Sequence, residues 1–194
     1  MPGLLPQIDP DGLLEFSVVY TDCALNHMSK RFRGVMTDIS AMLKRVYGAH
    51  SAALVPGSGT FGMESVARQF ATGQHVMVIR NGWFSYRWTQ IFEMGSIPAS
   101  HTVLKAQRTD EGSQVPWAPM PIAEVKAALV FAPHVETAAG MILPDDYLSE
   151  VADAVHAVSS LFVLDCIASG AMWVDMAATG VDVLISAPQK GWSR

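Results

Sequence analysis

Two residues that could do chemistry follow apolar runs near the end of the chain. Asp165 comes directly after the apolar run 161–164, and Lys190 lies five residues beyond the run 181–185. A partly desolvated lysine has the lowered pKa that its amine needs to attack an aldehyde. An acid at the end of a buried strand could hold a cation in a cleft, although most such acids cap a helix or form a turn. The separation of 25 residues leaves room for one crossover and one strand.

A glycine-serine turn, Gly57-Ser58-Gly59-Thr60, precedes a helical pattern. Backbone N–H groups at a helix start are unpaired and the helix dipole favours an anion, so this turn could bind a phosphate. Such turns are also common without any ligand. The turn is not a Walker loop, because no Gly-Lys-Ser/Thr follows, and it lacks the third glycine of a dinucleotide-binding fingerprint.

Two other segments carry side chains that could contact a ligand. Residues 81–88 are dense in aromatic rings, one of which could stack on a flat heterocycle, although such rings are mostly core or interface. The segment His134-Val135-Glu136-Thr137 follows the apolar run 128–131. Thr137 could donate to a ligand oxygen, or it could be an ordinary turn hydroxyl.

These residues lie in an alternation of helical patterns and short apolar runs. Apolar spacing predicts helices over 29–47, 61–70, 83–92, 123–129 and 145–158, and strands over 52–55, 76–79, 128–131, 161–164 and 181–185, with one more strand within 95–104 and a long loop over 106–121. This alternation predicts an α/β fold, a mostly parallel sheet with helices on both faces. Ligands of such folds bind at the carboxyl ends of the strands.

The composition excludes several classes of protein. The chain has 194 residues and a net charge of -5, so one domain is expected and no basic surface indicates nucleic acid as a partner. No apolar stretch approaches the roughly 20 residues that span a bilayer. The two cysteines do not make a disulfide framework, which predicts a cytoplasmic protein. We predict no membrane, nucleic-acid or metal partner.

The order of these motifs resembles that of the class V (fold-type I) pyridoxal-phosphate (PLP) aminotransferases, especially the alanine–glyoxylate and serine–pyruvate group. The resemblance runs from about Asn26 to the end of the chain, and its strongest parts are Val163-Leu164-Asp165 and Ser186-Ala187-Pro188-Gln189-Lys190. The other matching motifs are Asn26-His27-Met28-Ser29, Gly57-Ser58-Gly59-Thr60 with Met63-Glu64, Asn81-Gly82-Trp83-Phe84, and His134-Val135-Glu136-Thr137 with Gly140.

The resemblance implies a domain organisation and two catalytic residues. An N-terminal arm over residues 1–25 would precede a PLP-binding large domain over 26–194, which is incomplete and lacks the C-terminal small domain. Lys190 would bind the cofactor as a Schiff base and move protons, and Asp165 would pair with the pyridinium nitrogen. The remaining cofactor-binding residues would be Ser58, Gly59, Thr60 and Gln189 at the phosphate, Phe84 stacked on the ring, Ile167 under it, and Thr137 at the ring face or phenolic oxygen.

The implied activity is PLP-dependent transfer of an amino group from a small amino acid, alanine or serine, to a 2-oxo acid such as glyoxylate or pyruvate, by a homodimer. One alternative is a PLP lyase or cysteine desulfurase of the same fold, although Gln189 and Phe84 stand where those enzymes usually have histidine. A second is a truncated, non-catalytic remnant, because family members are much longer. Whether the chain is a fragment of a longer protein or the product of a truncated gene, we expect the isolated chain to be at best feebly active. A generic nucleotide-binding domain is disfavoured by the missing phosphate fingerprints.

Overall fold

The computed structural model describes residues 27, 30–109, 117–119 and 124–192. The chain divides into two compact units, Met1–Leu54 and Val55–Arg194. The described part of the first unit contains the amphipathic helix α1 (Lys30–Val46), which confirms the helix predicted over 29–47. Gly48 follows with a φ of 59°, the left-handed conformation typical of the residue after a helix.

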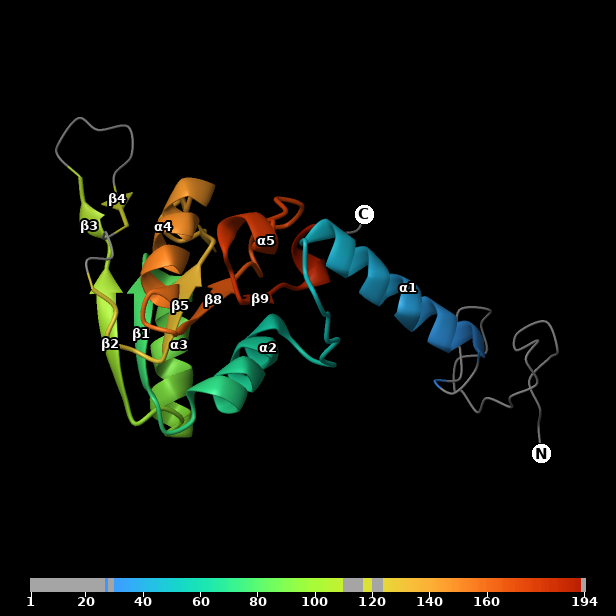
Figure 1. The fold of residues 1–194 in the computed structure, drawn as a ribbon, viewed down its shortest axis with the longest axis horizontal. Helices are drawn as coiled ribbons and strands as arrows, with labels where there is room; N and C mark the ends of the chain where they lie inside the picture. The colour runs from blue at the N-terminus through green and yellow to red at the C-terminus, as the bar shows by residue number, and fades with distance from the viewer. Residues whose placement is uncertain (1–26, 28–29, 110–116, 120–123, 193–194) are drawn as a thin grey trace. The chain divides into compact units, whose positions relative to one another are not determined.

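The second unit is built on a five-stranded sheet whose neighbouring strands are all parallel (Figure 1). The strand order is β2-β1-β5-β8-β9, with β1 at His75–Arg80, β2 at Ser100–Lys105, β5 at Leu129–Pro133, β8 at Leu161–Asp165 and β9 at Val183–Ile185. The residues of β5 are buried throughout, as expected for a strand covered on both sides. The predicted parallel sheet is confirmed.

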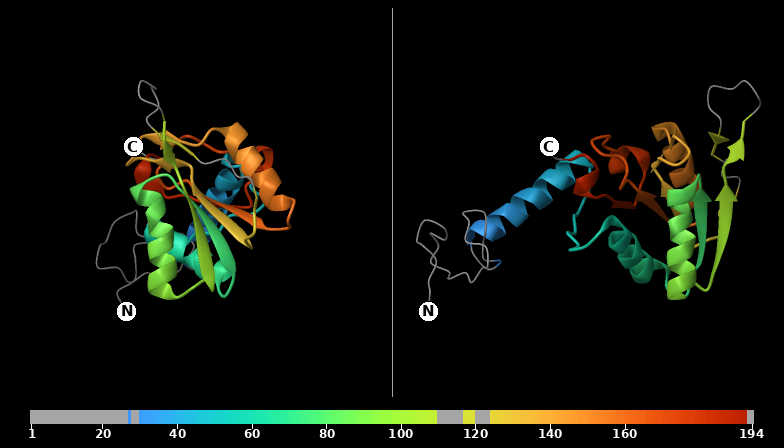
Figure 2. Two further views of the ribbon diagram at one scale, coloured as in Figure 1. Left: turned by 90° about the vertical axis from the view of Figure 1, so that its left-hand side faces the viewer. Right: turned by 180° about the vertical axis from the view of Figure 1, so that it is seen from behind.

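Helices cover both faces of this sheet (Figure 2). Along β1, Val76 and Val78 pack in one apolar cluster, while Met77 and Ile79 pack in a second cluster, because alternate side chains of a strand point to opposite faces. The first cluster contains side chains of α2 (Gly59–Val66), of the π-helical turn that continues it (Ala67–Ala71), and of α3 (Trp83–Gly95). The second is covered by α4 (Asp145–His156) and α5 (Met176–Thr179).

The structure corrects three predicted elements. Residues 52–55 form no strand with any described residue, and most of them are exposed, so nothing apolar holds this short run in a sheet. The described residues 124–128 are not helical, because Val125 and Ala127 alternate with exposed neighbours and enter the core as an extended segment does. Part of the predicted loop 106–121 is an antiparallel pair, β3 (Gln107–Arg108) with β4 (Trp117–Ala118).

The order of the strands reverses beside β1. The chain leaves β1 through α3 to reach β2 on one side, and then returns to place β5, β8 and β9 on the other side. Such a reversal opens a crevice at the carboxyl ends of the strands, where ligands of open α/β sheets bind. The segments that follow β1, β5, β8 and β9 therefore meet at this edge.

Candidate active site

A cavity of about 180 Å³ lies at the carboxyl edge of the sheet. Its walls come from the start of α2, the start of α3, the segment after β5, the end of β8 and the segment after β9. All nine residues for which the sequence predicted a cofactor role line it: Ser58, Gly59, Thr60, Phe84, Thr137, Asp165, Ile167, Gln189 and Lys190. The structure brings these residues together, and their roles stay predictions.

A local hydrogen bond and a buried glycine define the turn at the start of α2. Ser58 is the N-cap of the helix, and its hydroxyl oxygen accepts a hydrogen bond of 3.2 Å from the backbone N–H of Phe61. Gly59 is buried, and a Cβ at this position would lie 2.8 Å from Cδ1 of Ile167. A side chain at position 59 would therefore displace that of Ile167, and glycine lets the turn lie directly against the loop that follows β8.

Asp165 is a buried acid at the end of β8, with 9% of its surface exposed. The pKa of its carboxyl group is raised from 3.8 to about 6, mainly by burial and also by the nearby Glu136. A hydrogen bond of 2.9 Å from the N–H of Ile167 to Oδ1 and the nearby charge of Arg87 act in the opposite direction. The surrounding protein thus offsets only part of the cost of burying the ionised carboxylate. A cationic group bound in the cavity would stabilise it.

Lys190 ends a short 3-10 helix, Pro188–Lys190, in the segment after β9. It lines the same cavity as Asp165, but it is exposed, so the partial desolvation expected from the sequence is not present in this chain. Its backbone lies against the loop after β8: a Cβ on Gly170 would be 3.1 Å from the carbonyl oxygen of Lys190. Gly170 has a φ of 59°, a left-handed conformation that favours glycine, and glycine also leaves room for this close approach.

The loop that carries Gly170 is tied to the end of β5. The ring Nδ1 of His134 and the hydroxyl of Ser169 are 2.7 Å apart, and both side chains are buried. Burial lowers the pKa of His134, which favours the neutral ring. The backbone N–H of His134 also donates to the carbonyl oxygen of Asp165. These contacts fix the loop against which the backbone of Lys190 packs.

Glu136 is a structural residue beside the cavity, and no role was predicted for it from the sequence. Its carboxylate is fully buried and accepts hydrogen bonds from the backbone N–H groups of Phe84, Ser85 and Ala138 and from the hydroxyl of Ser85, at 2.7 to 3.3 Å. It thereby satisfies the first N–H groups of α3, which lack partners within a helix. Phe84, which is 41% exposed, is held at the cavity by this contact.

Arg87 lines the cavity, and no role was predicted for it from the sequence. Its Nη1 donates a hydrogen bond of 2.9 Å to Oγ1 of Thr60, which joins α3 to the start of α2. Its spacing from Phe84 could have predicted that Arg87 lines the cavity, because residues three apart share one face of a helix. The turn at Thr60 could not be paired with it from the sequence.

Cys166 is fully buried, and burial raises the pKa of its thiol to about 12. A thiol in this state is a poor nucleophile, because the thiolate is the reactive form. Cys23 lies outside the described residues. Within the described ranges no group of three or more His, Cys, Asp and Glu is arranged to hold a metal ion. No described helix is both long and apolar enough to cross a membrane.

Comparison with known proteins gives the relatives of the chain. No protein-family model matches it. It is 32% identical over 181 residues to 2-aminoethylphosphonate–pyruvate transaminase 2 of Paraburkholderia xenovorans, and 28% identical over 178 residues to the alanine–glyoxylate aminotransferase of Rattus norvegicus. The chain is homologous to the amino-terminal half of class V aminotransferases. The alignments cover 87% and 86% of the chain but only 44% and 40% of these relatives, so it spans less than half of their length.

Solved structures show that the chain has the fold of these aminotransferases. The ureidoglycine–glyoxylate aminotransferase of Bacillus subtilis matches 85% of the chain with a TM-score of 0.67 and 22% identity, over 42% of its own length. The alanine–glyoxylate aminotransferase of Nostoc sp. matches the same share with a TM-score of 0.67 and 21% identity, over 43% of its length. A cysteine desulfurase of Thermococcus onnurineus also matches, with a TM-score of 0.60 and 17% identity over 87% of the chain and 42% of its own length. The fold alone therefore does not separate these activities.

Proposed function

We propose that the cavity binds PLP and that this chain forms the cofactor-binding part of an aminotransferase. The reaction would move an amino group from a small amino acid, alanine or serine, to a 2-oxo acid such as glyoxylate or pyruvate. The observation that carries the proposal is that Lys190 and Asp165 line one cavity together with the turn Ser58-Gly59-Thr60. The homologous class V aminotransferases are PLP-dependent in general.

The residues of the cavity fit the three chemical parts of this cofactor. The buried carboxyl of Asp165, whose pKa is raised by burial, suits the protonated ring nitrogen, because a cation there would relieve the cost of ionising the acid. The turn at the start of α2 offers N–H groups and the hydroxyls of Ser58 and Thr60 to the phosphate. Lys190 provides an amine at the same cavity for the aldehyde.

When bound, the cofactor supplies an electron-withdrawing ring that stabilises negative charge at the α-carbon of the substrate. The chain would supply the proton transfers: Nζ of Lys190 takes the proton from that α-carbon and returns a proton later, as a general base and then a general acid. Asp165 keeps the ring nitrogen protonated. Phe84 and Ile167 would hold the ring between them, Thr137 would contact the ring face or its phenolic oxygen, and Gln189 would help to bind the phosphate.

The names of the relatives support a 2-oxo acid as the amino acceptor more than they support any particular amino donor. They include aminotransferases named for glyoxylate or pyruvate as the second substrate, with aminoethylphosphonate, alanine or aspartate as the first. A 2-oxo acid acceptor is thus common to the relatives, while their donors differ. A homodimeric assembly and a cytoplasmic location stay predictions.

No feature of the described structure favours the alternative of a lyase or desulfurase. A desulfurase needs a reactive cysteine, and the raised pKa of the buried Cys166 opposes that role. The alternative of a non-catalytic remnant makes a distinct prediction, namely that the chain does not bind PLP.

Titration of the chain with PLP, followed by visible absorbance, tests the proposal. We expect a saturable absorbance band that is lost in Lys190→Ala and kept in Lys126→Ala. Lys126 is the matched control, because it is exposed and pairs with Glu124 at the surface. Equal binding by both variants, or none by the unmodified chain, would contradict the proposal.

A further inference from the structure

Arg87 stands at the end of the cavity where the phosphate of the cofactor is proposed to bind. It lines the cavity together with Ser58, Gly59 and Thr60, and its Nη1 lies 2.9 Å from Oγ1 of Thr60. Arg87 and Thr60 also line a neighbouring hollow of about 400 Å³, so they form the wall between the two spaces. Arg87 is only partly exposed, which places its charge at the rim of the cavity rather than in open solvent.

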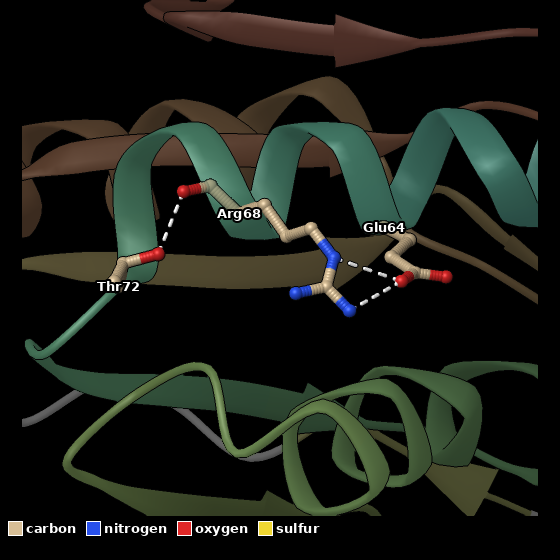
Figure 3. Close-up of polar contacts among 3 residues, drawn as sticks. All are labelled: Glu64, Arg68 and Thr72. Carbon is tan, nitrogen blue, oxygen red and sulfur yellow. Dashed lines mark hydrogen bonds and ion pairs between the residues drawn. The ribbon is translucent and has the colours of Figure 1, made fainter.

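Within the described part of the chain, no carboxylate lies within ion-pair distance of Arg87. Its charge acts on Asp165 from further away and lowers the pKa of that acid. The nearby Arg68 differs, because its Nη2 lies 2.7 Å from Oε1 of Glu64 and its Nε donates to the same oxygen (Figure 3). Arg87 thus keeps its charge available for an anionic ligand.

The charges that line the cavity indicate which anionic group Arg87 would bind. Among its described lining residues, the cations are Arg87 and Lys190. If Lys190 bonds to the aldehyde carbon, Arg87 is the cation left to face the phosphate, which carries up to two negative charges. The hydroxyl of Thr60 accepts its bond from Arg87, and a hydroxyl that accepts in this way keeps its own hydrogen to donate elsewhere.

We propose, resting on the proposed function, that Arg87 binds the phosphate group of PLP and orients the hydroxyl of Thr60 to donate to the same group. Arginine suits this role, because its planar guanidinium offers several N–H donors and binds phosphate by charge-assisted hydrogen bonds. The turn at the start of α2 would then hold the phosphate by its N–H groups, and Arg87 would add the charge that the turn lacks.

The test compares two ligands that differ only in the phosphate. Dissociation constants of PLP and of pyridoxal, which has no phosphate, are measured for the unmodified chain and for Arg87→Gln. We expect the substitution to weaken PLP about tenfold to hundredfold, as for the loss of a charge-assisted hydrogen bond, and to leave pyridoxal nearly unchanged. Inorganic phosphate should also compete with PLP less effectively in the variant.

Two controls keep the result specific. Arg68→Gln removes a neighbouring arginine that is already paired with Glu64, and it should bind both ligands as the unmodified chain does. Thermal unfolding of Arg87→Gln shows whether the fold is kept. If the unmodified chain binds PLP and Arg87→Gln binds it equally well, or loses PLP and pyridoxal to the same extent, the role of Arg87 is wrong while the proposed function stands. If the unmodified chain binds no PLP, the proposed function itself fails.

Discussion

At the scale of single residues, Asp165 shows how burial prepares an acid for a cationic ligand. The pKa of its carboxyl is raised from 3.8 to about 6, mainly by burial. Between about pH 4 and 6, the folded chain therefore holds a proton that the unfolded chain has lost. The free energy of unfolding falls as the pH rises through this window, and the loss persists above it. The acid thus destabilises the cofactor-free chain at neutral pH.

The substitution Asp165→Asn removes the charge and keeps an oxygen that accepts from the N–H of Ile167. At pH 8 we expect the cofactor-free variant to be more stable than the unmodified chain by up to about 3 kcal/mol, the equivalent of the raised pKa. The difference should shrink as the pH falls toward about 4, where the acid is protonated in the folded chain. Urea denaturation at several pH values measures it. A variant that is less stable at pH 8 would contradict the assignment.

Glu136 gives a second prediction at this scale. Its buried carboxylate accepts from four donors, and the amide of Glu136→Gln has only one oxygen to offer them. We expect a loss of about 1–3 kcal/mol in the free energy of unfolding, because buried N–H groups lose their acceptor.

Glu124→Gln is the matched control for that loss. Glu124 is exposed and, among the described residues, pairs with Lys126, so its substitution should change stability by less than about 1 kcal/mol. Equal, small effects of the two substitutions in urea denaturation would show that Glu136 does not hold the start of α3.

At the scale of elements, the segments after β8 and β9 depend on each other. Gly170 has a φ of 59° and its Cα faces the carbonyl oxygen of Lys190, while Gly191, with a φ of 140°, lies against Gly170 from the other segment. The backbone of the lysine therefore packs against the loop that follows β8.

Gly170→Ala tests this dependence against Gly140→Ala. Both glycines are left-handed, so each alanine should cost about 1–2 kcal/mol of stability. A Cβ at Gly140 meets nothing within 4 Å, whereas one at Gly170 lies 3.1 Å from the oxygen of Lys190. We expect Gly170→Ala to lose more stability and also to weaken PLP binding, which a titration would show. Identical behaviour of the two variants would mean that the contact between the loops is unimportant.

Elements with strong local patterns could be predicted from the sequence, and others could not. Continuous apolar runs predicted β1, β5 and β8, because strands buried on both faces need no polar alternation. The run 52–55 has the same local pattern but no strand partner in the described structure, and pairing is decided by distant residues. The short pair β3–β4 was missed for the same reason, since two-residue strands have no periodicity.

At the scale of the whole molecule, the sheet order explains why residues far apart in sequence share one cavity. The positions of Thr137, Asp165 and Lys190 at or beyond the carboxyl ends of β5, β8 and β9 could be predicted, because these residues follow apolar runs. The turn at Ser58 follows the run 52–55, which forms no strand with any described residue.

Glu136 contacts residues of α3 that lie 51 and 52 positions away in the sequence, and Arg87 contacts Thr60, which lies 27 positions away. No local sequence pattern indicates either contact. Contacts of this kind can be identified only in the folded structure.

The central claim is that Lys190 is the lysine that carries the cofactor, opposite Asp165. Its most direct test is to equilibrate the chain with PLP, reduce it with borohydride and map the modified peptides by mass spectrometry. We predict that the label is found on the peptide that contains Lys190 at low PLP concentration, before exposed lysines such as Lys105 and Lys126 are modified. A label distributed over the surface lysines, with no preference for position 190, would contradict the account.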